Sequence, residues 1–251
     1  RINQAWVDVG AYESGFASCL QVSNATLYVN QGASASGNGD SWVSAFKELR
    51  QALVAAGQCT NITTIYVAKG TYKPTDNASR DSAFFIPRNK LKIYGGYDAG
   101  TGLRNIGSNP TILSGDIGTA GVNTDNSYHV VVIAGVTGAD SLVLDGFTIT
   151  GGNANNTGSK DYNGLTVYQS EGSGFYLHSN NSVAGRIAIR NCISTGNNAT
   201  NFGAGFYNKL SSPTISNCVF TFNTSNSGAG MFNYNVSNPS ITNSVFANNT
   251  A

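Results

Sequence analysis

The last third of the chain repeats its hydrophobic and polar positions at one constant spacing. Between these positions, short runs of alternating apolar and polar residues end at Gly, Asn or Pro, which is typical of β-strands separated by tight turns. Self-similarity at a fixed spacing of 26 indicates a repeat architecture. Three sets of positions share the spacing: Ile189, Ile215 and Ile241; Asn191, Asn217 and Asn243; and Asn197, Asn223 and Asn249.

The repeat predicts a solenoid of parallel strands. Helical repeats would need an apolar stripe every 3.6 residues, and these segments contain none. In a solenoid each strand pairs with its equivalent in the next turn, about 4.8 Å away, so that identical positions stack. We expect the isoleucine set to form an apolar column inside. Both asparagine sets are expected at corners, where Asn tolerates left-handed backbone and can pass amide hydrogen bonds along the axis.

A second motif, Gly-x-Gly followed by two large apolar residues, recurs at 172–176, 203–207 and 228–232. Alternation along a strand places the two large residues on opposite faces, so one column fills the core and the other lies outside. An outer aromatic column offers a large contact area to sugar rings or to a neighbouring protein. The alternative is that a loop packs over this column, because an exposed apolar stripe is costly. The candidate ligand-binding residues are Tyr176, Tyr207, Phe232, Tyr162 and Tyr168.

Less regular strands are expected between residues 60 and 150. An earlier copy of the repeat, at 144–154, aligns with residues 189–199 at an offset of 45 instead of 26. The excess predicts an insertion at about residues 155–171, the segment that contains Tyr162 and Tyr168. It also offers a loop that could cover the aromatic column. The regular turns then occupy residues 172–251.

Residues 41–56 are predicted to form the helix of this chain. Asp40 or Ser41 supplies its N-cap, and Gly57 ends it. We expect the helix to cover one end of the solenoid, because an uncovered end exposes core and unpaired strand edges. Its apolar face comprises Trp42, Ala45, Phe46, Leu49, Ala52 and Leu53.

Composition supports an all-β protein. Charged residues make up 11% of the chain, too few for the solvated faces of a helical bundle, whereas 40% hydrophobic residues are too many for a disordered chain. The formal net charge of +1 gives no electrostatic footprint for nucleic acid or an anionic membrane. No apolar run approaches the roughly 20 residues of a membrane span. Because the chain begins at Arg1 without Met, we expect it to be part of a longer protein.

Four cysteines are compatible with one or two disulfides or with none. Cys192 and Cys218 occupy equivalent positions of the repeat. We expect buried free thiols there, since neighbouring parallel strands rarely present disulfide geometry, and a disulfide between them is the alternative. Cys19 and Cys59 are the better candidates for a disulfide.

Together these motifs resemble the right-handed parallel β-helix proteins of the pectate-lyase-like superfamily, in their bacterial surface-protein branch. Residues 27–30, 37–42 and 65–72 look like the N-terminal cap and first turn of that branch. The Gly-Ala-Gly-Phe and Phe-x-x-Asn pieces are similar to the repeats of polymorphic outer-membrane proteins, which are autotransported adhesins. Residues 1–25 resemble the closing segment of a preceding β-helix module with its linker. Residues 26–251 would then be a second β-helix domain, incomplete at its C-terminal end.

The resemblance implies a secreted, cell-surface or extracellular location. It also implies that neighbouring modules, or copies of the same chain, are the partners, with surface glycans as further candidates. Neither nucleic acid nor a membrane span is expected for this segment.

Many β-helix proteins are polysaccharide lyases or hydrolases, which need paired carboxylates or a calcium ion held by carboxylates. Residues 172–251 contain no Asp or Glu, and the remaining acids are scattered. Asp116 and Asp145 are expected to accept backbone hydrogen bonds in turns, with a calcium-ligand role as the alternative. His129 and His178 have no second ligand at a metal-binding spacing. We therefore expect no catalytic residue, metal site or cofactor, a structural calcium ion excepted.

The sequence favours a non-catalytic structural or adhesive module of a large bacterial surface repeat protein, such as a fibre, an adhesin or a surface layer. A carbohydrate-active β-helix enzyme and a carbohydrate-binding module without catalysis are the alternatives. Clustered Asp and Arg side chains in a groove would favour the enzyme.

Overall fold

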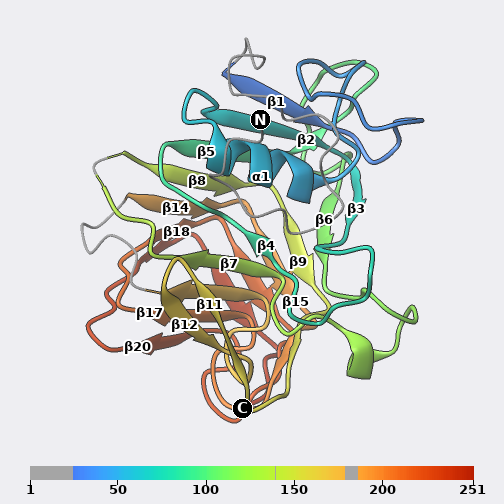
Figure 1. Cartoon of the computed structure of the whole chain (residues 1–251). Helices are drawn as coiled ribbons and strands as arrows, with labels where there is room; N and C mark the ends of the chain where they lie inside the picture. Colours follow the sequence, from blue (N-terminus) through green and yellow to red (C-terminus); the bar gives the residue numbers. More distant parts are fainter. Residues whose placement is uncertain (1–24, 139, 179–185) are drawn as a thin grey trace, which may run out of the picture.

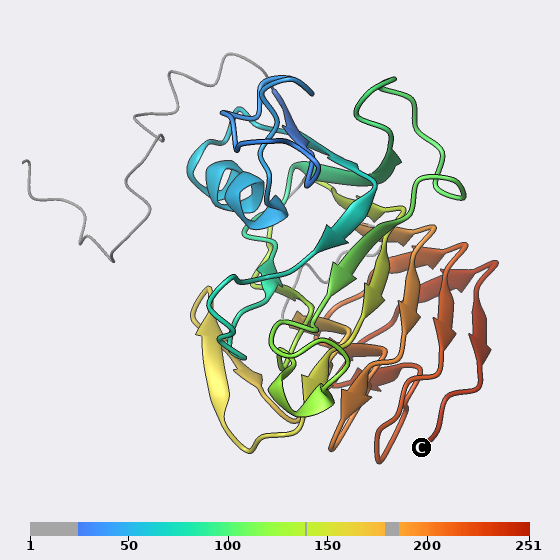
Figure 2. The same cartoon turned by 90° about the vertical axis from the view of Figure 1, so that its right-hand side faces the viewer.

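The computed structural model describes residues 25–138, 140–178 and 186–251, so the expected closing segment lies outside the described residues except for its last position. The described chain is an all-β protein with one α-helix and three long parallel sheets (Figure 1). The chain passes through the three sheets in turn, and within each sheet the strands lie in sequence order (Figure 2). This arrangement is compatible with the expected solenoid.

The neighbouring strands of all three sheets pair in parallel. The seven-stranded sheet contains β1 (Thr26–Val29), β2 (Thr64–Ala68), β5 (Leu91–Tyr97), β8 (Leu142–Asp145), β14 (Ile187–Arg190), β18 (Thr214–Ser216) and β21 (Ser240–Thr242). The six-stranded sheet contains β3 (Gly70–Tyr72), β6 (Thr111–Ser114), β9 (Thr148–Thr150), β15 (Ile193–Thr195), β19 (Val219–Thr221) and β22 (Val245–Ala247). The five-stranded sheet contains β4 (Phe84–Phe85), β7 (Val131–Ala134), β13 (Phe175–His178), β17 (Phe206–Lys209) and β20 (Phe232–Tyr234).

Two smaller pairs complete the β-structure. β10 (Asn153–Ala154) and β16 (Asn198–Ala199) pair in parallel at a corner. β11 (Ser159–Tyr162) and β12 (Leu165–Tyr168) form an antiparallel hairpin, which occupies the position of the expected insertion.

The constant register that the sequence predicts is confirmed in two of the sheets. In the seven-stranded sheet Ile189 pairs with Ile215, which in turn pairs with Ile241. In the six-stranded sheet β15, β19 and β22 keep the same offset. The five-stranded sheet differs, because Phe175 pairs with Phe206 at an offset of 31, and Tyr207 pairs with Phe232 at an offset of 25. The length of the connections to this sheet therefore changes from one turn to the next.

The first asparagine set forms the corner column that the sequence predicts. Asn191, Asn217 and Asn243 have φ angles of 51°, 53° and 47°, which is the left-handed region. Asn217 Nδ2 donates a hydrogen bond to Asn191 Oδ1 at 3.3 Å. The three equivalent positions therefore follow one another along the axis.

The second asparagine set forms a column as well, but it points inward. Asn197 Nδ2 donates to Asn223 Oδ1 at 3.1 Å, and Asn223 Nδ2 donates to Asn249 Oδ1 at 3.0 Å. Asn197 and Asn223 are buried, and they lie just after β15 and β19, where the chain leaves the six-stranded sheet. Their amides satisfy backbone groups inside the turn, such as the Ile149 carbonyl that accepts from Asn197.

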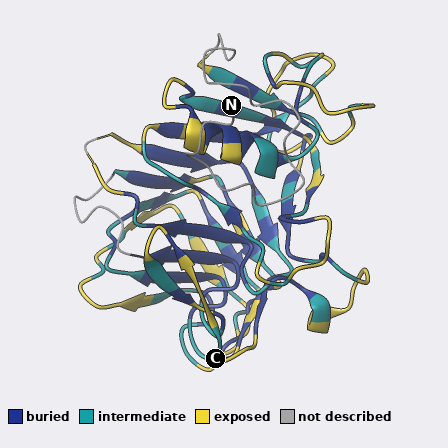
Figure 3. Cartoon of the chain, in the orientation of Figure 1, coloured by how far each residue is buried: buried dark blue, intermediate teal, exposed yellow. Residues whose placement is uncertain are grey.

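One continuous hydrophobic core runs along the axis, from Leu27 in β1 to Phe220 in β19 (Figure 3). Ile189 and Ile215 are fully buried within it, as expected for an apolar column. Ile241 is 39% exposed because its strand, β21, lies at the edge of the sheet.

The helix is shorter than the sequence predicts. Helix α1 runs over Leu49–Gln58, and its N-cap is Glu48, which forms a capping box with Gln51, so neither Asp40 nor Ser41 caps it. The preceding residues form bends and a turn instead of a helix, and Phe46 among them bridges to Val29 in parallel. The Phe46 amide donates a hydrogen bond to the Tyr28 carbonyl, and the Phe46 carbonyl accepts one from the Asn30 amide. Because these backbone groups pair with β1, they are not available for helical hydrogen bonds.

Helix α1 packs against β1 and β4, at the N-terminal end of the sheets. Leu49, Ala52 and Leu53 enter the core, as expected for its apolar face. Trp42 lies on the other side of β1, against the rings of Tyr28 and Tyr97. No helix among the described residues is long and apolar enough to cross a membrane.

The cysteines separate into two kinds. Cys192 and Cys218 are buried free thiols, which confirms that expectation. Each sulfur lies near the backbone carbonyl of the second residue before it. Cys59 is disulfide-bonded. Its expected partner, Cys19, lies outside the described residues.

Candidate functional site

The predicted aromatic column exists on the outer face of the five-stranded sheet. Tyr176 of β13 pairs with Tyr207 of β17, and Tyr207 with Phe232 of β20. The ring centroids are 4.8 Å apart in the first pair and 6.0 Å apart in the second. On the inner face, the tilted rings of Phe175 and Phe206 lie in the core with their centroids 5.1 Å apart. Strand alternation thus separates the two columns as expected.

The hairpin β11–β12 covers most of this outer column. Tyr162 and Val167 of the hairpin form one apolar cluster with Tyr176 and Tyr207, which are 0% and 3% exposed. This is the arrangement that the packing alternative predicts. A ligand cannot reach these two rings while the hairpin is in place. Of the five candidates, Tyr168 is exposed and Phe232 half-buried.

Glu171, which the sequence did not single out, has a half-buried carboxyl group that contacts two tyrosines of the column. The Tyr176 hydroxyl donates to Glu171 Oε2 at 3.1 Å, and the Tyr207 hydroxyl is a further partner of this carboxyl. Burial raises the pKa of Glu171, and the two tyrosine hydrogen bonds oppose the rise. Lys209 lies near the rim, with its Nζ 5.7 Å from the Tyr168 ring centroid. Glu171 and Lys209 therefore give an otherwise apolar surface a polar edge.

Both histidines lie beside the column and are buried. Desolvation lowers the pKa of His129 to about 4. Its Nδ1 lies 3.1 Å from the Gly172 carbonyl, which can only accept, so Nδ1 carries the proton of a neutral ring. The pKa of His178 is also lowered, again mainly by desolvation. The two imidazoles serve the packing of this face.

A groove of about 570 Å³ separates helix α1 from the hairpin. Tyr162 and Phe85 provide aromatic walls, with centroids 5.0 Å apart. Arg50 and Lys160 provide positive charge, although Arg50 is paired with Asp76 at 2.6 Å. Sequence reasoning named Tyr162 but missed the groove. Residues 50 and 162 carry no shared pattern, and only the fold brings them together.

The two turn aspartates differ. Asp116 accepts a backbone hydrogen bond from Gly121 at 2.9 Å, as expected. Asp145 instead accepts from the Arg104 guanidinium at 2.5 Å and from Asn191 Nδ2 at 3.0 Å, so its expected backbone role is wrong. The physical reason is the corner column, which brings Asn191 next to the end of β8. No group of three or more His, Cys, Asp or Glu residues gathers at metal-binding distance within the described residues.

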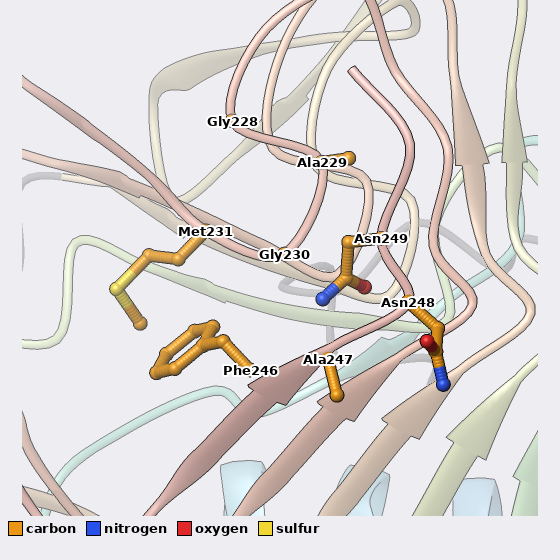
Figure 4. A pocket seen from close by; sticks show the side chains of 8 residues that line it. All are labelled: Gly228, Ala229, Gly230, Met231, Phe246, Ala247, Asn248 and Asn249. Carbon is orange, nitrogen blue, oxygen red and sulfur yellow. The ribbon is translucent and has the colours of Figure 1, made fainter.

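The C-terminal face of the sheets carries a second surface. β20, β21 and β22 are each the last strand of their sheet, so one edge of each is unpaired. A cavity of about 340 Å³ opens between residues 228–231, which precede β20, and residues 246–249, at and after the end of β22. Figure 4 shows Met231 and Phe246 pointing toward one another there. Val245 and Phe246 are 53% and 43% exposed. This face combines unpaired backbone with apolar side chains.

No family model, no curated protein and no solved structure matches this chain.

Proposed function

We propose that the chain is a right-handed parallel β-helix of the pectate-lyase-like type, and that it is a non-catalytic structural or adhesive module of a secreted or cell-surface bacterial repeat protein. The observation that carries the proposal is the in-register pairing of equivalent positions along the axis in the seven- and six-stranded sheets. The fold class rests on these ladders and on the sequence motifs together.

The stacking of equivalent residues in successive turns suits a load-bearing role. Each turn contacts mainly the turns before and after it, as in other solenoids, so the module is a rod built from nearest-neighbour interfaces. Backbone hydrogen bonds, the inner asparagine column and the apolar core all run parallel to the axis. A pull along the axis therefore opposes many bonds at once.

We assign neighbouring modules or copies of the same chain as the partners. Unpaired strand edges accept further strands by backbone hydrogen bonding, and β20, β21 and β22 each have one unpaired edge among the described strands. A further layer of strands, from the same chain or from another, would bury the exposed apolar residues of β21 and β22.

The double variant Val245→Lys/Phe246→Lys tests this assignment by sedimentation velocity over a wide concentration range. Charge on the edge opposes strand addition, so the wild type should associate with concentration while the variant stays monomeric. Val43→Lys is the control, because Val43 is 99% exposed and lies near the opposite end. A wild type that stays monomeric throughout contradicts the assignment. Release of unsaturated sugars from an acidic polysaccharide would contradict the non-catalytic role.

A carbohydrate-binding role is the second candidate, and the groove beside helix α1 favours it. Ligand sites are concave and mostly apolar with a few polar groups, and the aromatic walls and basic residues of this groove match that description. Phe85→Ala should abolish oligosaccharide binding in a titration, whereas Leu103→Ala, on an exposed side chain elsewhere, should not. Equal binding by both variants, or none by the wild type, removes this candidate.

A further inference from the structure

The segment between β6 and β7 contains four buried side-chain oxygens that have no hydrogen-bond partner. They are Asp116 Oδ1, Asp125 Oδ1, Asn126 Oδ1 and Ser127 Oγ. Asn126 is only 3% exposed and Ser127 is 0% exposed. A buried polar atom without a partner costs about 1 to 3 kcal/mol, and more if it is charged. Four such oxygens in one short segment form the kind of donor set that a hard cation binds.

The four residues lie on two stretches of chain that run side by side. The Ser127 amide donates to the Gly115 carbonyl at 2.8 Å. Asp125 Oδ2 accepts from the Thr119 amide at 2.7 Å, and an added Cβ at Gly118 would overlap the same carboxylate. Residues 125–127 therefore lie against residues 115–119.

Two further observations place Asp116 and Asn126 in the same loop. Asp116 Oδ2 accepts from the Gly121 amide, so this carboxylate turns back over the loop that also binds Asp125. An added Cβ at Gly151 would lie 3.2 Å from the Asp116 amide nitrogen and 3.6 Å from Asn126 Nδ2. The Asn126 side chain is therefore beside the backbone of Asp116.

Neither carboxylate is neutralised by a basic side chain. None of the ion pairs found in the described part of the chain includes Asp116 or Asp125. Arg80 approaches the loop, but its guanidinium donates to the carbonyls of Asn126 and Asn153 and to Asn155 Oδ1. The carboxylates of Asp116 and Asp125 therefore lie without a basic partner in the loop that also holds the neutral side-chain oxygens of Asn126 and Ser127.

We propose that this loop binds one Ca²⁺ ion through the carboxylates of Asp116 and Asp125, the amide oxygen of Asn126 and the hydroxyl of Ser127. The donors are all oxygen, which hard cations prefer, and no His or Cys belongs to the set. An irregular loop suits Ca²⁺ better than Mg²⁺, which demands a near-ideal octahedron. The ion would hold the two ends of this loop, at residue 116 and at residues 125–127, together.

Isothermal titration with CaCl₂ tests the site on the whole chain. We expect one site with a dissociation constant of about 0.1 to 1 mM, the range of extracellular calcium modules. Asp116→Asn and Asp125→Asn should each weaken binding at least tenfold. Asp140→Asn is the matched control, because Asp140 is exposed and outside the loop, and its affinity should equal that of the wild type.

Asn126→Asp provides a second arm if the two aspartate variants do not fold. It keeps the size of the side chain and adds a negative oxygen, so Ca²⁺ should bind more tightly. An unchanged affinity in this variant overturns the proposal, as does a wild type that binds no Ca²⁺. Undiminished binding by folded Asp116→Asn and Asp125→Asn overturns it equally.

Discussion

From β14 onward, the seven- and six-stranded sheets keep one constant offset, whereas the five-stranded sheet does not. In the first two, equivalent residues of β14, β18 and β21, or of β15, β19 and β22, keep one constant offset. In the third, the offset changes from one pair of strands to the next, and a hairpin covers the outer face. The two kinds of sheet therefore have different roles. The seven- and six-stranded sheets stack equivalent residues of successive turns, whereas the five-stranded sheet, called the variable region below, tolerates insertions.

The inner asparagine column should give the largest effect on stability. Asn223→Ala removes an amide that accepts from the backbone and side chain of Asn197 and donates to the Ser194 carbonyl. The groups left unpaired should lower the free energy of unfolding by about 3 kcal/mol. Urea denaturation, monitored by circular dichroism, measures this change in the free energy of unfolding.

Asn226→Ala is the control for that prediction. Asn226 is exposed on the same turn, and its loss should change stability by less than about 0.5 kcal/mol. Equal effects of the two substitutions would mean that the column does not stabilise the region of constant offset.

His129 should make the variable region sensitive to acid. Its folded pKa of about 4 lies below the unfolded value of 6.5, so folding favours the neutral ring. The stability from this group is complete above pH 6.5 and is lost as the pH falls through 4, a loss of roughly 3 kcal/mol. Denaturation at several pH values should show the fall in the wild type and a smaller one in His129→Gln. Parallel profiles for the two proteins would refute a buried neutral imidazole.

A smaller effect is expected at the tyrosine that binds Glu171. Tyr176→Phe deletes a hydroxyl that donates to the half-buried carboxyl and should cost about 1 to 2 kcal/mol. Tyr168→Phe, on an exposed ring of the hairpin, should cost less than about 0.5 kcal/mol. Thermal or urea unfolding of both variants compares the covered and uncovered parts of this face. If Tyr168→Phe proves the more damaging of the two, the hairpin does not shield the column as described.

The region of constant offset, from β14 to β22, could be predicted from the sequence because the same residue types recur at the same positions of each turn. Ile189, Ile215 and Ile241 stack since each turn has the same length, and that length is visible in the spacing. The inward direction of Asn197 and Asn223 was not visible, because Asn serves both corners and interiors. The chemistry of an isolated residue does not say which backbone groups it must satisfy.

The rest depended on contacts between distant segments. Helix α1 begins at Leu49 because Phe46 pairs with β1, a tertiary event that overrides local propensity. The groove joins Arg50 to Tyr162, which lie far apart in the sequence. The approach of Asp125 to Asp116 depends on how their loop folds back, and the sequence had singled out only Asp116, as a turn aspartate.

Paired spin labels offer the most direct measurement of the central claim, that like positions of successive turns lie over one another. Ser216 and Thr242 are paired partners in β18 and β21. With Ser216→Cys/Thr242→Cys, labels on backbones about 4.8 Å apart should broaden the electron paramagnetic resonance spectrum strongly relative to either single variant. A double-variant spectrum equal to the sum of the two single-variant spectra would contradict the stacked register on which the whole account depends.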